Sequence, residues 1–323
     1  MRHPLIYIPT PGTEMEYHLP PLRVAGYVGW KLIRGGKVIR ESPMQKNLLT
    51  NMGFDALGNG DTYASGMAAA VGTGSNAPAA TDTTLQSEVV TGGRRVQGAT
   101  STGFVPIGGA VTQDYCWRKI IFTFLETQAN GNLTEFGTFK NGGGTMYARQ
   151  LFKDVGGTPT TIIKTNVDQL EVTYEYRSYP PLADVNLVAF AISGDAITSD
   201  ITIRCQMAQS NNWLFPLIDG PLSGGAVAHE DSTLASRTSQ SGSSPSAGNS
   251  SSTFSSYTNG NFYVDETIKF EPPVANFTTG IGLLKLYSYA PGQLYQASFT
   301  TKIPKTNVKR TTIVIRRSWA RFP

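Results

Sequence analysis

Hydrophobic and polar residues alternate along several stretches of this 323-residue chain. In the clearest stretch, residues 169–177, polar residues separate the apolar and aromatic positions Leu170, Val172, Tyr174 and Tyr176. Because successive side chains of a strand point to opposite faces of a sheet, this period predicts a β-strand with one buried face. The run 117–125 is more continuously apolar, which predicts a strand in the centre of a sheet.

Strand-like patterns recur at 145–152, 201–207, 281–289 and 308–318. In the last of these we expect a buried middle, charged ends that reach solvent or a partner, and Trp319 packed where the strand ends. The sequence also predicts a hairpin from Gly26 to Ile39 that turns at Gly35-Gly36. A short helix is expected at 50–57, with Thr50 as its N-cap and Gly58 as its stop.

Two segments have no strand-like period. Residues 1–24 contain five prolines, which predicts an extended N-terminal arm. Eleven of the 21 residues between Ser236 and Ser256 are serine, so we expect a Ser-rich loop at 232–258. The body at 25–323 has room for two β sub-domains that meet near 178–195, and no internal repeat is evident.

The composition agrees with a chain of many short strands joined by turns. Gly (34) and Pro (19) are plentiful, and charged residues make up only 15%. We therefore predict a mainly β protein: an antiparallel β-sandwich or jelly-roll-like fold with an extended N-terminal arm and one or two short helices.

Positive charge is concentrated at the C-terminal end, although the net charge of the whole chain is only +4. Residues 302–323 contain seven Lys and Arg and no Asp or Glu. Two readings stay open: one polar strand face, or a surface that docks on an acidic partner. Nucleic-acid binding is disfavoured because aromatic residues are not interleaved with the basic ones.

Other classes are disfavoured by what the sequence lacks. We expect Cys116 and Cys205 to be buried thiols of a protein made in a reducing cytoplasm. No run of about 18 apolar residues predicts a membrane span. No Gly-Xaa-Ser-Xaa-Gly or phosphate-loop motif occurs. The only compact polar triplet that resembles a site is His229-Glu230-Asp231, which we read as a solvated loop, because adjacent strand residues do not converge on a ligand. We expect no catalytic residues, metal or cofactor.

Several short motifs follow one another in a definite order. They are Asn47-Leu48-Leu49-Thr50-Asn51, Val71-Gly72-Thr73-Gly74 with Pro78, Thr81-Asp82 and Leu85, Leu133-Thr134-Glu135-Phe136-Gly137, Tyr147-Ala148-Arg149-Gln150-Leu151-Phe152, Leu170 to Arg177, and Ser318-Trp319-Ala320-Arg321. The ordered set resembles virion structural proteins of tailed bacteriophages, of the minor-tail and tail-fibre-like kind. The resemblance implies a tail component that assembles in the host bacterial cytoplasm as a homo-oligomer, with no catalytic residues.

The leading hypothesis is therefore a structural component of a phage tail (fibre, baseplate or collar/neck-associated). We expect a trimer or higher cyclic homo-oligomer that docks to other tail proteins, without nucleic acid or membrane insertion. The candidate interface residues are Leu5, Tyr7, Arg316, Arg317, Trp319 and Arg321.

Two alternatives remain. The first is a host-receptor or glycan-binding module at the tail tip, with exposed loop aromatics Tyr257, Phe262 and Tyr263 as contacts. The second is a virion-borne glycan hydrolase, for which paired carboxylates are the usual requirement.

Overall fold

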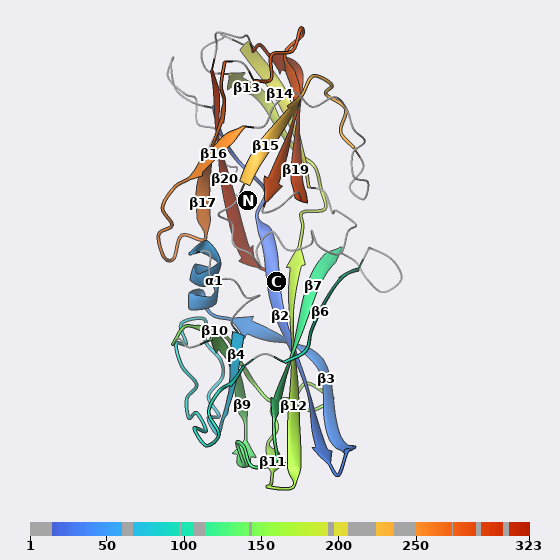
Figure 1. Cartoon of the computed structure of the whole chain (residues 1–323), viewed down its shortest axis with the longest axis vertical. Coiled ribbons are helices and arrows are strands. Elements are labelled where there is room, and N and C mark those ends of the chain that lie inside the picture. The colour runs from blue at the N-terminus through green and yellow to red at the C-terminus, as the bar shows by residue number, and fades with distance from the viewer. Residues whose placement is uncertain are drawn as a thin grey trace. The chain divides into compact units, whose positions relative to one another are not determined.

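Strands account for most of the chain in the computed structural model (Figure 1). The structure describes residues 15–59, 67–96, 98–105, 114–141, 144–192, 197–205, 224–235, 250–272, 274–288, 292–305 and 310–323. Apart from one parallel pair, the strand pairs recorded in these parts are antiparallel. The prediction of a mainly β fold of sandwich-like, antiparallel sheets is confirmed.

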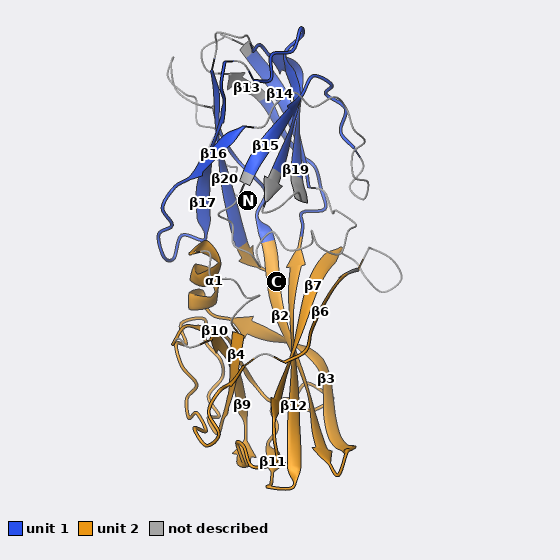
Figure 2. Ribbon diagram, in the orientation of Figure 1, with its two compact units in different colours: residues 1–22, 180–216, 220–319 blue, residues 23–179, 217–219, 320–323 orange. Residues whose placement is uncertain are grey.

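The chain divides into two compact units (Figure 2). Unit 2 is residues 23–179 together with the last four residues, 320–323. The described parts of 1–22, 180–216 and 220–319 form unit 1. One of the connections between the units therefore lies between Tyr179 and Pro180.

Unit 2 contains two layers of strands. One has the order β6-β7-β12-β2 and the other the order β3-β10-β9-β4-β5, and β2 also pairs with β3. Side chains from both layers meet in the core, where the Phe122 and Phe136 ring centroids are 6.3 Å apart. The strands are β2 (Leu22–Arg34), β3 (Lys37–Leu49), β4 (Met67–Gly72), β5 (Arg95–Val96), β6 (Thr100–Val105), β7 (Tyr115–Phe124), β8 (Gly131–Leu133), β9 (Glu135–Lys140), β10 (Met146–Leu151), β11 (Ile162–Lys164) and β12 (Asp168–Tyr179).

Unit 1 is also built from two layers of strands. A five-stranded sheet has the order β13-β14-β19-β18-β15, and the second layer contains β16, β17, β20 and β1. Residues from both layers, such as Phe299 and Ile313, share one buried hydrophobic cluster. The strands are β1 (Met15–His18), β13 (Val185–Ile192), β14 (Ile197–Cys205), β15 (Gly224–His229), β16 (Ser251–Phe254), β17 (Tyr263–Phe270), β18 (Ile281–Ser288), β19 (Gly292–Ile303) and β20 (Thr311–Arg321).

Several local predictions are confirmed. The hairpin between β2 and β3 turns at Gly35 and Gly36, both with positive φ, where glycine avoids strain. Helix α1 (Asn51–Gly58) begins after Thr50, whose hydroxyl accepts a hydrogen bond from Gly53 N at 3.0 Å. The predicted central strand is β7, which pairs with β6 and β12.

Three predicted boundaries were wrong. Residues 15–24 were assigned to the arm, yet they form β1 and the start of β2. Pro20 and Pro21 lie between these strands, where a missing N–H interrupts no ladder. The Ser-rich segment contains β16, because an edge strand pairs through its backbone whatever its side chains. The last strand, β20, runs to Arg321 rather than ending at Ser318.

Both units follow one eight-strand pathway, which the sequence did not reveal. In unit 2 the eight strands are β2, β3, β4, β6, β7, β9, β10 and β12, and in unit 1 they are β13 to β20. In each unit the first strand pairs with the second, the second with the seventh, the seventh with the sixth and the sixth with the third. The fourth also pairs with the fifth, and the fifth with the eighth. All of these pairs are antiparallel, so the strand pairing repeats although no repeat is evident in the sequence.

A buried lysine occupies the same place in both pathways, and we call this arrangement the lysine clasp. Lys164 Nζ donates to Leu125 O at 2.8 Å, Glu126 O at 3.3 Å and Asn130 Oδ1 at 2.9 Å. The unit 1 lysine, Lys305, is 3% exposed. It donates to the backbone oxygens of Glu271 (2.9 Å) and Pro272 (3.1 Å), and to Asn276 Oδ1 (3.2 Å).

The two clasps also agree in backbone conformation and register. The residue before each asparagine is a buried alanine with positive φ, 51° at Ala129 and 59° at Ala275. In each unit the fifth strand ends in a phenylalanine, which pairs with a residue six positions after the clasp lysine: Phe124 with Leu170, and Phe270 with Thr311. This agreement supports two copies of one structural unit within the chain.

The clasps provide a matched test of this equivalence. Replacing Lys164 or Lys305 by Met keeps the apolar stem but removes the three hydrogen bonds that the buried ammonium group donates, which costs about 1–3 kcal/mol. Urea unfolding should show this loss for both variants, and hydrogen exchange should place it in unit 2 for Lys164→Met and in unit 1 for Lys305→Met. The control, Lys37→Met, changes an exposed lysine. Equal behaviour of all three variants would contradict a role for the clasps.

Candidate functional site

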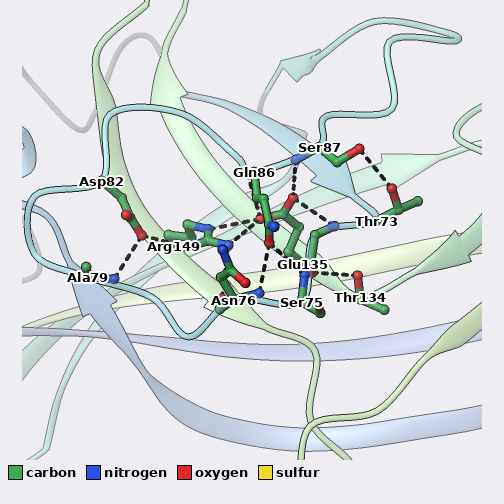
Figure 3. Close-up of polar contacts among 11 residues, drawn as sticks. Thr73, Ser75, Asn76, Ala79, Asp82, Gln86, Ser87, Thr134, Glu135 and Arg149 are labelled. Atoms are coloured by element: carbon green, nitrogen blue, oxygen red, sulfur yellow. Dashed lines mark hydrogen bonds and ion pairs between the residues drawn. The ribbon is translucent and has the colours of Figure 1, made fainter.

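Three of the motifs that carry the sequence resemblance meet around one carboxylate, that of Glu135 (Figure 3). Glu135 is the first residue of β9, beside Gly72 at the end of β4. Arg149 comes from β10 on the other side of β9. The loop of residues 73–87, which we call the anchored loop, closes over both side chains.

The Glu135 side chain is 0% exposed, and both of its oxygens are occupied. Oε1 accepts from Gly74 N at 3.1 Å and from Ser87 N at 2.8 Å. Oε2 accepts from Gln86 N at 3.1 Å and from Arg149 Nε at 2.9 Å. One carboxylate thus ties the beginning of the anchored loop to its end through charge-assisted hydrogen bonds.

Arg149 carries the network outward from Glu135. It is 3% exposed, and its Nη1 lies 2.7 Å from Asp82 Oδ2. Its Nη2 donates to Asn76 O at 3.1 Å. Asp82 Oδ2 also accepts from Ala79 N at 2.8 Å. The arginine therefore holds the middle of the loop as Glu135 holds its ends, and its guanidinium bridges two carboxylates.

Three glycines and one leucine explain why these motifs have their composition. A Cβ at Gly72 would lie 2.5 Å from Glu135 Oε1, and a Cβ at Gly74 would overlap the same atom. Leu85 is 5% exposed and belongs to a small hydrophobic cluster with Phe139 and Met146. A Cβ at Gly137 would lie 3.0 Å from Leu85 Cδ2, so this glycine leaves room for the apolar anchor.

The bonds of the Glu135 carboxylate favour a structural role over a catalytic one. A catalytic carboxylate must reach a substrate, whereas both oxygens of Glu135 are bonded to the protein's own donors. Within the described residues, no group of three or more His, Cys, Asp and Glu side chains is placed to hold a metal ion. The network instead fixes a long surface loop at the edge of a sheet.

Of the predicted interface residues, Leu5 and Tyr7 lie outside the described residues. Arg316 is half-buried and forms a bidentate ion pair with Asp265. Its Nε donates to Oδ1 at 2.7 Å and its Nη2 to Oδ2 at 2.8 Å. Arg321 donates to Leu49 O at 3.0 Å and to Asn51 Oδ1 at 2.6 Å. Burial lowers the pKa of Arg321. Their roles as interface residues stay predictions.

The expectation that Arg317 reaches solvent or a partner was wrong. Arg317 is 7% exposed, on the face of β20 that also carries Ile313 and Ile315. Its Nε donates to Glu266 Oε2 at 2.7 Å, and Glu266 is 0% exposed. Burial raises the pKa of Glu266, and the positive charge of Arg317 opposes that rise. This pair is part of the interior of unit 1.

The three predicted receptor-contact aromatics lie close to the end of β20, where Trp319 is located. Trp319 is 3% exposed, and its backbone N donates to Phe262 O at 3.0 Å. Its ring centroid lies 5.7 Å from that of Tyr257. Tyr263 lies under the Arg316 guanidinium, 3.8 Å from its ring centroid. Tyr257, Phe262 and Tyr263 are half-buried rather than exposed, so their description as exposed loop contacts was wrong.

The triplet His229-Glu230-Asp231 is also less solvated than expected. His229 ends β15 and is 4% exposed, and burial, with the positive charge of Lys285 adding to it, lowers its pKa to about 4. Glu230 Oε1 accepts from Thr279 N at 2.9 Å, and Asp231 Oδ1 from Thr233 N at 2.9 Å. The two carboxylates thus stabilise turns, and the triplet does not converge on a common point.

Comparisons with known proteins leave the family open. No protein-family model, no curated protein and no solved structure matches the chain. The described part of the chain contains no helix that is long and apolar enough to cross a membrane.

Sequence reasoning found the motifs but missed the Glu135–Arg149–Asp82 network. A signal was present, since Glu135 and Arg149 each stand among residues that form buried strands. A charge at such a position needs a partner of opposite sign. The sequence could not name that partner, because β9 and β10 become neighbours only in the folded sheet.

The anchored loop predicts a specific sensitivity at Gly74. Replacing Gly74 by Ala pushes a methyl group into the Glu135 carboxylate, and such overpacking typically costs about 1–3 kcal/mol. Urea unfolding should show this loss, and limited proteolysis should cut within 73–87 more rapidly. Gly144→Ala is the control, because its Cβ would enter open space. Unchanged proteolysis of Gly74→Ala would exclude the anchoring role.

The buried pair in β20 predicts that Arg317 is needed for the fold. Replacing Arg317 by Gln leaves Glu266 buried without its counter-charge, which costs roughly 3–5 kcal/mol. Arg310→Gln is the matched control: Arg310 pairs with Glu271, but its side chain is 59% exposed. Thermal and urea unfolding of both variants should show an early transition for Arg317→Gln alone. Similar melting of the two variants would mean that the buried pair contributes little.

Proposed function

We propose that this protein is a structural component of a bacteriophage tail, which assembles as a symmetric homo-oligomer and docks to other tail proteins. The observation that carries the proposal is the use of the motif residues. Gly72, Gly74, Asp82, Glu135 and Arg149 come from motifs that resemble those of tail proteins, and all of them serve to fix one loop. Such a network suits a rigid scaffold that presents surface to neighbours.

The polar chemistry of the described residues supports the same proposal. The carboxylates of Glu135, Glu266 and Asp168 are buried and bonded to arginines of the same unit. Those of Glu230 and Asp231 stabilise turns. An enzyme site leaves reactive groups open toward a substrate, so this use of charge favours a structural role.

Neither alternative is favoured by a specific observation. The receptor-binding alternative relied on three aromatics: Tyr257 packs against Trp319, Tyr263 packs against Arg316, and the backbone oxygen of Phe262 accepts from Trp319 N. For the glycan hydrolase, the adjacent carboxylates of Glu230 and Asp231 are bonded to Thr279 and Thr233 and hold turns together.

Labelling of purified particles tests the location. Antibodies raised against the purified chain should bind the tails of intact virions in electron micrographs, with an antibody against a head protein as the control. Labelling of heads, or no association with particles, would overturn the proposal.

Light scattering tests the self-assembly. The purified chain should give a mass that is a multiple of 34.8 kDa at micromolar concentration. A single species of 34.8 kDa would count against self-assembly in solution.

A further inference from the structure

The first strand of the eight-strand pathway pairs with different numbers of strands in the two units. In unit 2 this strand, β2, pairs with β3 along one edge and with β12 along the other. In unit 1 it is β13, and within the described residues only β14 pairs with it. The second edge of β13 is thus the one place where unit 1 lacks a strand pair that unit 2 has among these eight strands.

The pairing partners of the eighth strands explain the difference. In unit 2, β12 runs antiparallel along β2 for an unbroken ladder from Asp168↔Arg34 to Tyr179↔Arg23. In unit 1 the eighth strand is β20, and β1 lies against it in parallel, from Met15↔Ile313 to His18↔Arg316. The N-terminal strand therefore occupies an edge of β20, and among the described strands β13 has no equivalent partner.

The open edge of β13 lacks the usual protection against pairing. Its sequence, Val-Asn-Leu-Val-Ala-Phe-Ala-Ile, contains no charged residue and no proline, the two features that commonly block edge strands. Val188 is 71% exposed. Other edge strands of the described sheets are shorter: β5 has two residues and β16 has four.

A bulge in β13 does not prevent pairing at its second edge. The β13–β14 register shifts between Leu187 and Phe190. In unit 2 the β2–β3 register shifts twice, between Val28 and Trp30 and again after Leu32. The ladder between β2 and β12 continues past both shifts. A bulge in the pairing with one neighbouring strand thus does not prevent the first strand from forming a ladder along its opposite edge.

We propose that the open edge of β13 pairs antiparallel with β13 of a second copy of this chain. A strand that pairs with its own copy doubles any charge that it carries, and β13 carries none. The inference rests on the homo-oligomer of the proposed function and supplies one of its contacts.

The symmetry of this contact limits what it builds. Pairing of β13 with itself is two-fold and uses the same patch on both copies. Alone it gives a dimer, and combined with a cyclic contact it joins two rings face to face. In both cases it extends the five-stranded sheet of each copy into one ten-stranded sheet across the dimer axis.

Charge introduced at the exposed position of β13 tests the contact in the full chain. Val188→Lys should raise the dissociation constant for self-association at least tenfold in analytical ultracentrifugation, since it brings two positive charges into one two-fold contact. Val155→Lys is the matched control, because Val155 lies in a turn of unit 2 and is 74% exposed. Asn186→Lys, at another exposed site on β13, provides a second variant if Val188→Lys melts early.

Hydrogen exchange gives an independent reading. The amides of β13 should become better protected as the wild-type concentration rises, and Val188→Lys should abolish this change. Association of Val188→Lys and Asn186→Lys that equals wild type would overturn the β13 contact but leave the homo-oligomer standing. A wild-type chain that stays at 34.8 kDa would overturn the contact, while particle labelling judges the tail location separately.

Discussion

A charge buried in a β-sandwich must find a partner inside the protein, and this constraint organises both units. Glu135, Asp168 and Glu266 are each 0% exposed. Each is met by an arginine from another strand or hairpin: Arg149, Arg34 and Arg317. The Arg34 guanidinium, assisted by Thr165, holds the pKa of the Asp168 carboxyl well below its usual range. Each pair fixes the register of the strands that carry it, because an unpartnered ion is costly in the interior.

The lysine clasps satisfy the same constraint with backbone oxygens instead of carboxylates. In each turn after the fifth strand, one lysine ammonium group donates hydrogen bonds to two backbone carbonyl oxygens. The asparagine that follows supplies the third acceptor. A single buried lysine thus fixes the turn and the entry to the eighth strand together. The recurrence of this solution, with the same spacing to the paired phenylalanine, is the strongest sign that the units are copies.

The two units differ in the connection between the third and fourth strands. The connection between the third and fourth strands is the anchored loop and its continuation in unit 2, and the Ser-rich segment in unit 1. In unit 2 an ion network holds this connection. In unit 1 its first residues are held by separate bonds: Glu230 Oε1 accepts from Thr279 N at 2.9 Å, and Ala235 N donates to Gln296 Oε1 at 3.0 Å. Divergence in such connections, with a common core, allows one architecture to present two different surfaces.

The sequence by itself determined the features that depend on near neighbours. The alternation at 169–177 fixed β12 and its buried face, Gly35-Gly36 fixed a hairpin turn, and Thr50 fixed the start of α1. It also placed Arg317 on the same face as Ile313, since the period of a strand is a local property.

Only the tertiary structure decided which distant groups meet. The partner of Arg317 is Glu266, across the β17–β20 ladder, and that of Glu135 is Arg149, across β9–β10. The repeat was hidden for a related reason. The Ala-Asn pairs at 129 and 275 are 146 residues apart, whereas the clasp lysines at 164 and 305 are 141 apart, so no fixed period links them along the chain. Strand pairing tolerates loops of unequal length, and only the folded sheets bring equivalent residues to equivalent places.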